Sequence, residues 1–129
     1  MTELNQKVEQ YDLREHVIFL GRRNDIPDLL KMIDILIIPS AFEGFPLAGL
    51  AAVAGVPVIA CDAAGAEEFI RVSRDGVTFA EDDVDSAADA VGKILEGKEQ
   101  YKKAGIEFAS QMSNREYSTK VEQIFKSIE

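Results

Sequence analysis

The sequence predicts an α/β fold, with a parallel sheet of about four strands, helices on both faces and a helical C-terminal tail. Three observations carry this prediction. Short apolar runs alternate along the chain with longer segments whose apolar residues recur at helical spacing. The apolar runs are uninterrupted, as expected of strands that are covered on both faces. Strand and helix alternate in the order typical of βαβ units, which build parallel sheets with right-handed connections.

The expected strands are short. They lie at residues 17–20 (VIFL), 35–38 (ILII), 57–61 (PVIAC) and 76–80 (GVTFA). The ILII run is apolar throughout, which is typical of a strand with helices above and below it. The GVTFA strand is expected to lie near an edge of the sheet.

The expected helices follow from apolar spacing and from residues that start or end helices. They lie at residues 2–11, 24–34, 45–55, 66–72, 83–97, about 98–112 and 114–128. Asn24 or Asp25 can cap the second of these helices, and Pro27 suits its first turn. Gly55 ends the third helix, and aspartates cap the helix that begins at residue 83.

Composition and charge argue against several classes of function. The chain has 129 residues, the length of about one domain, and a formal net charge of −9. This charge argues against non-specific binding of DNA or RNA, which needs a positive surface. No apolar run is long enough to span a membrane, and the opening segment lacks the apolar core of a signal peptide. We therefore expect no nucleic-acid partner and no membrane span.

The single cysteine and the single histidine exclude several chemistries. Cys61 alone cannot form an intrachain disulfide, which favours a cytoplasmic location, and we expect it to be a buried apolar residue. His16 is the one residue that could complete a serine or cysteine triad, and we expect it at the surface. Because no cysteine and histidine have the spacing of metal ligands, no metal is expected.

In a parallel α/β sheet, ligands bind outside the carboxyl ends of the strands. Three polar segments follow expected strands: residues 21–25 (GRRND), 39–46 (PSAFEGFP) and 62–68 (DAAGAEE). Site residues should come from these segments. Within them, Asp62 is expected to shape a turn rather than to touch a ligand. Phe42 and Phe45 flank Glu43 and are expected to anchor in the core rather than to stack on a base or sugar.

The segment that contains Glu43 has the features of an anion site at the start of a helix. Pro46 fits a first helical position, where the free N–H groups of Phe45 and Leu47 point outward and favour a phosphate. Gly44 lets a ligand approach the backbone closely, and Glu43 can accept hydrogen bonds from hydroxyls. A sugar linked to a diphosphate offers both groups. The same residues equally allow a capped helix with a glutamate that faces solvent.

From residue 14 to about residue 96, the chain resembles the nucleotide-sugar-binding C-terminal half of group-1 retaining glycosyltransferases, which have the GT-B fold. The resemblance rests on the order and spacing of FLG with a short polar loop, DILIIPS, EGFPL, AGVPVIA and DAAGAEE. It implies a Rossmann-like sheet. It also implies that residues 1–129 form a single truncated domain of the GT-B C-terminal type.

The resemblance assigns roles to residues of this chain. Glu43 is expected to contact hydroxyls of the donor sugar and so to orient it for catalysis. The residues expected to bind the rest of the donor are Gly44, Phe45 and Leu47, through backbone amides at the diphosphate, and Arg22 and Arg23, beside the base. The nucleotide-diphospho-sugar is a substrate, so no cofactor is expected.

The chain departs from the family pattern. The family usually carries a second glutamate eight residues after the first, where it accepts hydrogen bonds from the ribose hydroxyls. Ala51 stands at that place, so Ala51→Glu is expected to tighten donor binding. Ala64 and Gly65 stand where the family often has two glycines, and Glu68 matches a glutamate that braces the adjacent loop.

Family members also have a separate N-terminal acceptor domain and two further βα units, with an Arg–Lys pair for the diphosphate, ahead of the part matched here. In the family's sheet those units separate the strands that match residues 17–20 and 35–38. Residues 17–20 must therefore close directly onto residues 35–38 or leave a gap. Because an open edge invites pairing, we expect a rearranged four-stranded sheet or a homodimer that covers the defect.

Two functions of different classes follow. The first is the donor-binding part of a glycosyltransferase that transfers a hexosyl group to a glycan or lipid acceptor, with the isolated chain inactive for lack of an acceptor domain. The second is a non-catalytic, degenerate or excised domain that serves as an interaction or oligomerisation module. Ala51 and the missing basic pair favour the second. The expected partners are a nucleotide sugar and either an acceptor domain or a second copy.

Overall fold

The computed structural model of the chain describes residues 3–40, 46–62 and 66–112. Its strands are β1 (Leu36–Ile38), β2 (Val58–Cys61) and β3 (Gly76–Phe79). Its helices are α1 (Glu3–Gln10), α2 (Ile26–Leu30), α3 (Pro46–Ala54), α4 (Ala66–Ser73) and α5 (Val84–Gln111). The strands form one parallel sheet in the order β1-β2-β3, which confirms the α/β fold and the edge position of β3.

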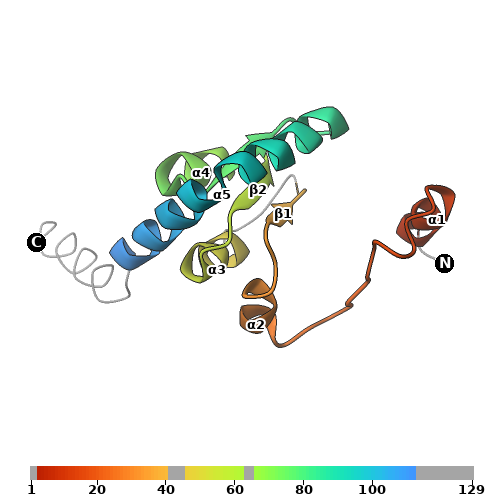
Figure 1. The fold of residues 1–129 in the computed structure, drawn as a ribbon, viewed down its shortest axis with the longest axis horizontal. Coiled ribbons are helices and arrows are strands. Elements are labelled where there is room, and N and C mark those ends of the chain that lie inside the picture. Colours follow the sequence, from red (N-terminus) through yellow and green to blue (C-terminus); the bar gives the residue numbers. More distant parts are fainter. Residues whose placement is uncertain (1–2, 41–45, 63–65, 113–129) are drawn as a thin grey trace, which may run out of the picture.

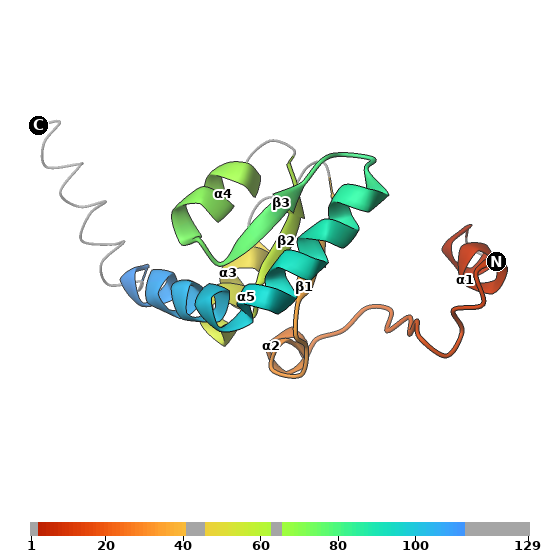
Figure 2. The ribbon, with the colours of Figure 1, turned by 45° about the horizontal axis from the view of Figure 1, so that its top comes forward.

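Helices cover both faces of this sheet, as the sequence predicts. On one face, Val58 and Ala60 of β2 pack with residues of α2, α3 and α4. On the other face, Ile59 packs with Ala90 and Ile94 of α5. All residues of β2 are buried, because the strand has a neighbour on each side and helices above and below. Figure 2 shows α5 running along the sheet, with α3 behind the strands.

Gly76 allows β2 and β3 to lie side by side. A Cβ atom at this position would stand 1.8 Å from the carbonyl oxygen of Val58, closer than any side chain can approach a backbone atom. Val58 in turn donates its N–H to the carbonyl of Asp75 at 3.0 Å. Only glycine therefore fits at the start of β3 without moving the two strands apart.

Several helix boundaries agree with the residues that predicted them. Pro46 is the first residue of α3, and Gly55, with φ of 68°, follows its last residue. Asp83 caps α5, where its carboxylate accepts from the N–H of Ser86 at 2.9 Å. Asp25 precedes α2 but makes no side-chain cap, because its carboxylate pairs with Arg23 instead.

The two helices expected at residues 83–97 and 98–112 form one long helix, α5. Gly97 has non-helical torsion angles (φ −111°, ψ 20°), so the expected boundary survives as a kink rather than as a loop. Glycine permits this local departure while the hydrogen-bonded turns on either side continue. The helix expected at residues 114–128 lies outside the described residues.

The expected strand at residues 17–20 is wrong. These residues form no strand, and the side chains of Ile18, Phe19 and Leu20 are exposed. They belong to an N-terminal segment, residues 3–20, which we call the arm. Figures 1 and 2 show the arm standing apart from the sheet and its helices. The physical reason is that a strand needs a hydrogen-bonded neighbour, and none of the described residues forms a strand beside residues 17–20.

The sheet therefore has three strands in the described residues, not four. The rearranged sheet in which residues 17–20 close onto β1 is not found there. The structure shows the other expected arrangement, a separation between the arm and β1 (Figure 1). The pairing edge of β1 that faces away from β2 is left open among the described residues.

Candidate functional site

The candidate donor site is at the carboxyl end of β1, where residues 39–45 lead into α3. Leu47 is in the first turn of α3. Glu43, Gly44 and Phe45, as well as Phe42, lie outside the described residues. Their expected roles, and that of Leu47, stay predictions.

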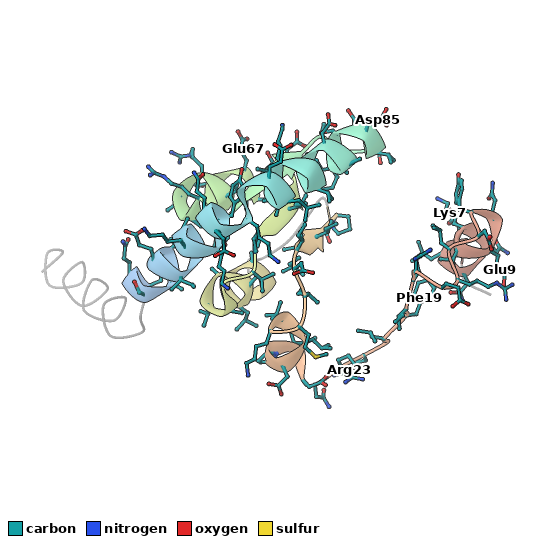
Figure 3. The ribbon with its side chains drawn as sticks, viewed as in Figure 1. Lys7, Glu9, Phe19, Arg23, Glu67 and Asp85 are labelled. Atoms are coloured by element: carbon teal, nitrogen blue, oxygen red, sulfur yellow. The ribbon has the colours of Figure 1, made fainter. Side chains whose placement is uncertain are left out.

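Arg22 and Arg23 precede α2 rather than following a strand. The guanidinium of Arg23 pairs with the carboxylate of Asp25, with Nε 2.8 Å from Oδ1. This hydrogen bond lowers the pKa of Asp25 and raises that of Arg23. Figure 3 shows Arg23 beside α2, at the end of the molecule away from the carboxyl end of β1. The structure does not bring Arg23 to the start of α3, and the expected role of both arginines at the base stays a prediction.

Ala51 is on the core-facing side of α3, and the expectation that a glutamate there would bind the ribose stays a prediction. Its side chain is 0% exposed and packs in the cluster that contains Val56 and Val58. A carboxylate at this position would be buried among apolar groups. The preceding residue, Leu50, is 42% exposed. A helix turns by about 100° per residue, so a shift of one position moves a side chain from solvent into the core.

Asp62 connects the end of β2 to the segment that follows β3, and its expected role in the turn after β2 stays a prediction. Its N–H donates to the carbonyl of Phe79 at 2.9 Å, and its Oδ1 accepts from the N–H of Glu81 at 3.2 Å. Nearby, the hydroxyl oxygen of Ser86 accepts from the N–H of Ala80 at 3.2 Å. The Asp62 carboxylate thus joins the end of β2 to the segment after β3, and the Ser86 hydroxyl joins that segment to the first turn of α5.

The structure also describes Glu68, Cys61 and His16, three residues for which the sequence led to expectations. Glu68 is exposed on α4 and forms an ion pair with Arg71 at 3.7 Å, so its described partner is on its own helix rather than on the loop it was expected to brace. Cys61 is buried and His16 is exposed, as predicted. Ala64 and Gly65 lie outside the described residues.

A buried carboxyl group was missed by the reading of the sequence. Asp75 is 1% exposed, and its Oδ1 is 2.5 Å from the hydroxyl of Ser73, whose oxygen is also 2.9 Å from the carbonyl of Phe69. The Ser73 hydroxyl is placed to donate to Asp75 Oδ1 or to the Phe69 carbonyl, and Asp75 Oδ2 has no hydrogen-bond partner among the described residues. Burial raises the pKa of Asp75. No local motif marks this aspartate as buried, because its surroundings come from distant segments.

Two further properties concern the described residues only. They contain no group of three or more histidine, cysteine, aspartate or glutamate side chains placed to hold a metal ion. Within the same residues, every helix is too short or too polar to cross a membrane.

Comparisons with known proteins identify the family. Residues 2–111 match the family model described as glycosyl transferases group 1. The chain is 31% identical over 100 residues to the lipopolysaccharide core biosynthesis mannosyltransferase LpsB of Rhizobium meliloti, covering 75% of this chain and 28% of that protein. It is 35% identical over 88 residues to UDP-Gal:alpha-D-GlcNAc-diphosphoundecaprenol alpha-1,3-galactosyltransferase of Escherichia coli, covering 67% and 23%. The chain thus spans about a quarter of each relative.

Solved structures show the same fold. Sucrose-phosphate synthase from Thermosynechococcus elongatus superposes with a TM-score of 0.81 at 23% identity, over 97% of this chain and 33% of that one. Alr3699/HepE of Anabaena, solved in complex with UDP, superposes with a TM-score of 0.78 at 25% identity, over 98% and 35%. The same protein in complex with UDP-glucose gives 0.79. Since the matched family model covers residues 2–111, the chain belongs to the group-1 glycosyltransferases.

Proposed function

We propose that this chain is the donor-binding part of a glycosyltransferase that transfers a hexosyl group from a nucleotide-diphospho-sugar to a glycan or lipid acceptor. The observation that supports the proposal is the likeness, over 98% of this chain, to Alr3699/HepE of Anabaena, which was solved with UDP and with UDP-glucose. The proposal treats residues 1–129 as a single domain of the GT-B C-terminal type. A cytoplasmic location belongs to the same proposal.

In this proposal the donor lies over the start of α3. The N–H groups of the first helical turn have no partner within the helix, and the helix dipole favours negative charge there. Backbone amides of Gly44, Phe45 and Leu47 hold the diphosphate, and the carboxylate of Glu43 accepts hydrogen bonds from the sugar hydroxyls. Fixed dipoles of this kind stabilise the charge that develops on a diphosphate leaving group without a metal ion. Arg22 and Arg23 border the base.

The isolated chain is proposed to bind donor without transferring sugar. Transfer needs an acceptor held close to the sugar, and the chain spans only about a quarter of the relatives that it matches. The proposed partner for transfer is therefore an acceptor domain.

A second candidate function is a non-catalytic interaction module. Two observations favour it: the edge of β1 that is open among the described residues, and the buried Ala51 at the position where the family's second glutamate would stand. A module of this kind would bind another polypeptide and would have weak affinity for nucleotides or none.

Isothermal titration of the chain with UDP-glucose, UDP, GDP-mannose and ADP-glucose separates the two functions. The donor-site proposal expects one of these ligands to bind. It also expects Glu43→Gln to weaken binding of the sugar nucleotide by about 10- to 100-fold, from the loss of hydrogen bonds worth about 1.5–3 kcal/mol to a charged group. Binding of the free nucleotide should change little, because Glu43 contacts only the sugar.

Glu96→Gln is the matched control, because this substitution makes the same change of charge at an exposed position of α5, outside the three candidate segments. It should leave the affinity unchanged. Equal effects of the two substitutions would show that Glu43 acts only through the charge of the surface. Failure of every ligand to bind at about 1 mM, a free energy of about −4.1 kcal/mol, would reject donor binding by this chain and favour the interaction module.

A further inference from the structure

Asp75 is a buried acid that the proposed function does not use. It lies at the amino end of β3, directly before Gly76, and its side chain is 1% exposed. Its Oδ1 is paired with the hydroxyl of Ser73, and its Oδ2 has no hydrogen-bond partner among the described residues. Because an ionised oxygen without a partner is costly away from water, this place favours the neutral form of the carboxyl group.

The second half of α5, residues 98–111, lies over this acid, and we call it the cover helix. A Cβ atom at Gly105 would stand 3.0 Å from the Cβ of Asp75 and 3.4 Å from the Cα of Ala52, so the helix backbone approaches both closely. About one turn later, the ring of Phe108 packs edge-on against that of Phe69 of α4, with the ring centroids 5.5 Å apart. Gly105 and Phe108 have no polar side chain, so the cover helix shields Asp75 without offering it a hydrogen bond from these residues.

Gly97 separates the cover helix from the first half of α5. Its non-helical torsion angles (φ −111°, ψ 20°) produce the bend that Figure 2 shows. The first half is held by Ala90 and Ile94, which pack with Ile59 on the other face of the sheet. Because the two halves pack on different parts of the fold, the cover helix can move about the bend while the first half stays in place.

The charged residues around Asp75 do not compensate its charge. α3 and β3 contain no charged residue. The end of α4 contributes Arg71 and Arg74, and the cover helix contributes Lys102 and Glu107, all of them exposed. Burial raises the pKa of Asp75, the hydrogen bonds from Ser73 and from its own backbone lower it, and none of these four charges contributes. Ionisation therefore creates a charge that water must stabilise.

We propose that the cover helix is a pH-sensitive latch, which stays closed over Asp75 while this carboxyl group is protonated and opens about Gly97 when the group ionises. Opening admits water to the new charge and gives up the contacts of Gly105 and Phe108. The latch also bears on α3, since Gly105 lies against Ala52. The inference rests on the packing of α5 and does not depend on donor binding.

The direction of the pH dependence follows from linkage. Burial raises the pKa of Asp75 in the closed form, whereas in the open form the group is hydrated and has its ordinary value of about 3.9. Below that value, opening does not depend on pH. As the pH rises from there to the closed-form pKa, the population of the open form should increase by up to about 10-fold per pH unit, and above the closed-form pKa it should level off.

Hydrogen–deuterium exchange of the wild-type chain, followed by mass spectrometry from about pH 4 to about pH 8, tests the latch. Each rate is divided by the rate of the unstructured amide at the same pH. The protection of residues 98–111 should fall as the pH rises, whereas that of residues 84–96 and of β2 should stay constant. Figure 1 shows these segments as separate parts of the ribbon, which peptide-level data can distinguish.

Two variants assign the effect to Asp75. Asp75→Asn has no proton to lose, so its cover helix should keep the same protection at every pH. Asp89→Asn is the matched control, because Asp89 is exposed on the first half of α5, and it should behave as the wild type does. Ser73→Ala removes the hydrogen bond that lowers the pKa of Asp75 against the effect of burial, so the pH at which opening levels off should move upward.

Three results would overturn the proposal. The first is protection of residues 98–111 that does not change with pH in the wild type. The second is an equal loss in both halves of α5 and in β2, which would show unfolding of the whole chain rather than a latch. The third is the wild-type pH dependence in Asp75→Asn, or, if that variant does not fold, an unchanged pH profile in Ser73→Ala.

Discussion

The strand β2 and residues 17–20 are both short runs of large apolar residues, yet their environments are opposite. In β2, strands on both sides and helices on both faces bury every side chain. In the arm, Ile18 and Phe19 are exposed and the backbone has no strand beside it. The comparison teaches that an apolar run becomes a strand only where the rest of the fold supplies neighbours. The predictions below test this contrast between the arm and the sheet with its helices, from the largest expected effect to the smallest.

Gly76→Ala should have the largest effect. The added Cβ atom overlaps the carbonyl oxygen of Val58, so β2 and β3 must separate. We expect a loss of at least about 4 kcal/mol in the free energy of unfolding, at the upper end for single substitutions. Urea denaturation followed by circular dichroism measures it. Gly92→Ala is the control, because a Cβ atom there meets no atom within 4 Å, and it should not destabilise the chain. Similar losses for the two variants would contradict the close approach at Gly76.

Ala51→Glu should lower the free energy of unfolding by nearly as much. The new carboxylate would be buried without a partner in the cluster around Val58, at a cost of about 3–5 kcal/mol. Leu50→Glu adds the same group one position earlier, where the side chain is half-exposed, and should cost less than about 1 kcal/mol. Thermal unfolding of both variants gives the comparison. If Ala51→Glu were as stable as Leu50→Glu, the helical phase of α3 described here would be wrong.

Shortening an isoleucine to alanine should change the free energy of unfolding by different amounts in the sheet and in the arm. Ile59→Ala removes a fully buried side chain between β2 and α5, and should destabilise the chain by about 2–5 kcal/mol. Ile18→Ala makes the identical change in the arm and should alter the stability of the monomer by less than about 0.5 kcal/mol. Urea denaturation at low protein concentration compares them. A large loss from Ile18→Ala there would mean that the arm packs on its own chain.

Asp75 should give a smaller effect that depends on pH. Burial raises its pKa in the folded chain, so the unfolded chain releases this proton first as the pH rises. Its contribution to stability is fully present below the ordinary aspartate pKa of about 3.9 and is lost as the pH rises through the folded value. Asp75→Asn should remove this part of the pH dependence of Tm. The exposed control Asp89→Asn should keep it, and equal pH profiles for wild type and Asp75→Asn would contradict a raised pKa.

Much of the fold could be predicted from the sequence because its signals are local. Pro46, Gly55 and Asp83 mark helix ends at the positions where the structure has them. The burial of Ile59 follows from an apolar run flanked by turn residues. The pattern at residues 17–20 is equally apolar, but whether it becomes a strand depends on a neighbour that the run itself does not specify. The sequence likewise does not decide between a loop and a kinked helix at Gly97, because a glycine is compatible with both.

The candidate site also combines features that the sequence predicts with features that only the structure shows. The EGFPL motif and its place after a strand are sequence features, and both point to the start of α3. Which side of α3 a residue occupies is a matter of helical phase, and Ala51, eight residues after Glu43, is buried in this structure. The pairing of Arg23 with Asp25 joins residues two apart in the sequence, although no motif marks it, whereas Asp75 also lies against Gly105 of α5, a distant part of the chain.

The most direct test of donor binding is an NMR titration of the ¹⁵N-labelled chain with UDP-glucose, followed amide by amide. The account predicts the largest shifts at Gly44, Phe45 and Leu47, and almost none in the arm between Glu3 and Leu20. Glu43→Gln should abolish the difference between the shifts caused by UDP-glucose and those caused by UDP. An absence of shifts at about 1 mM ligand, or shifts confined to the arm, would contradict a donor site at the start of α3.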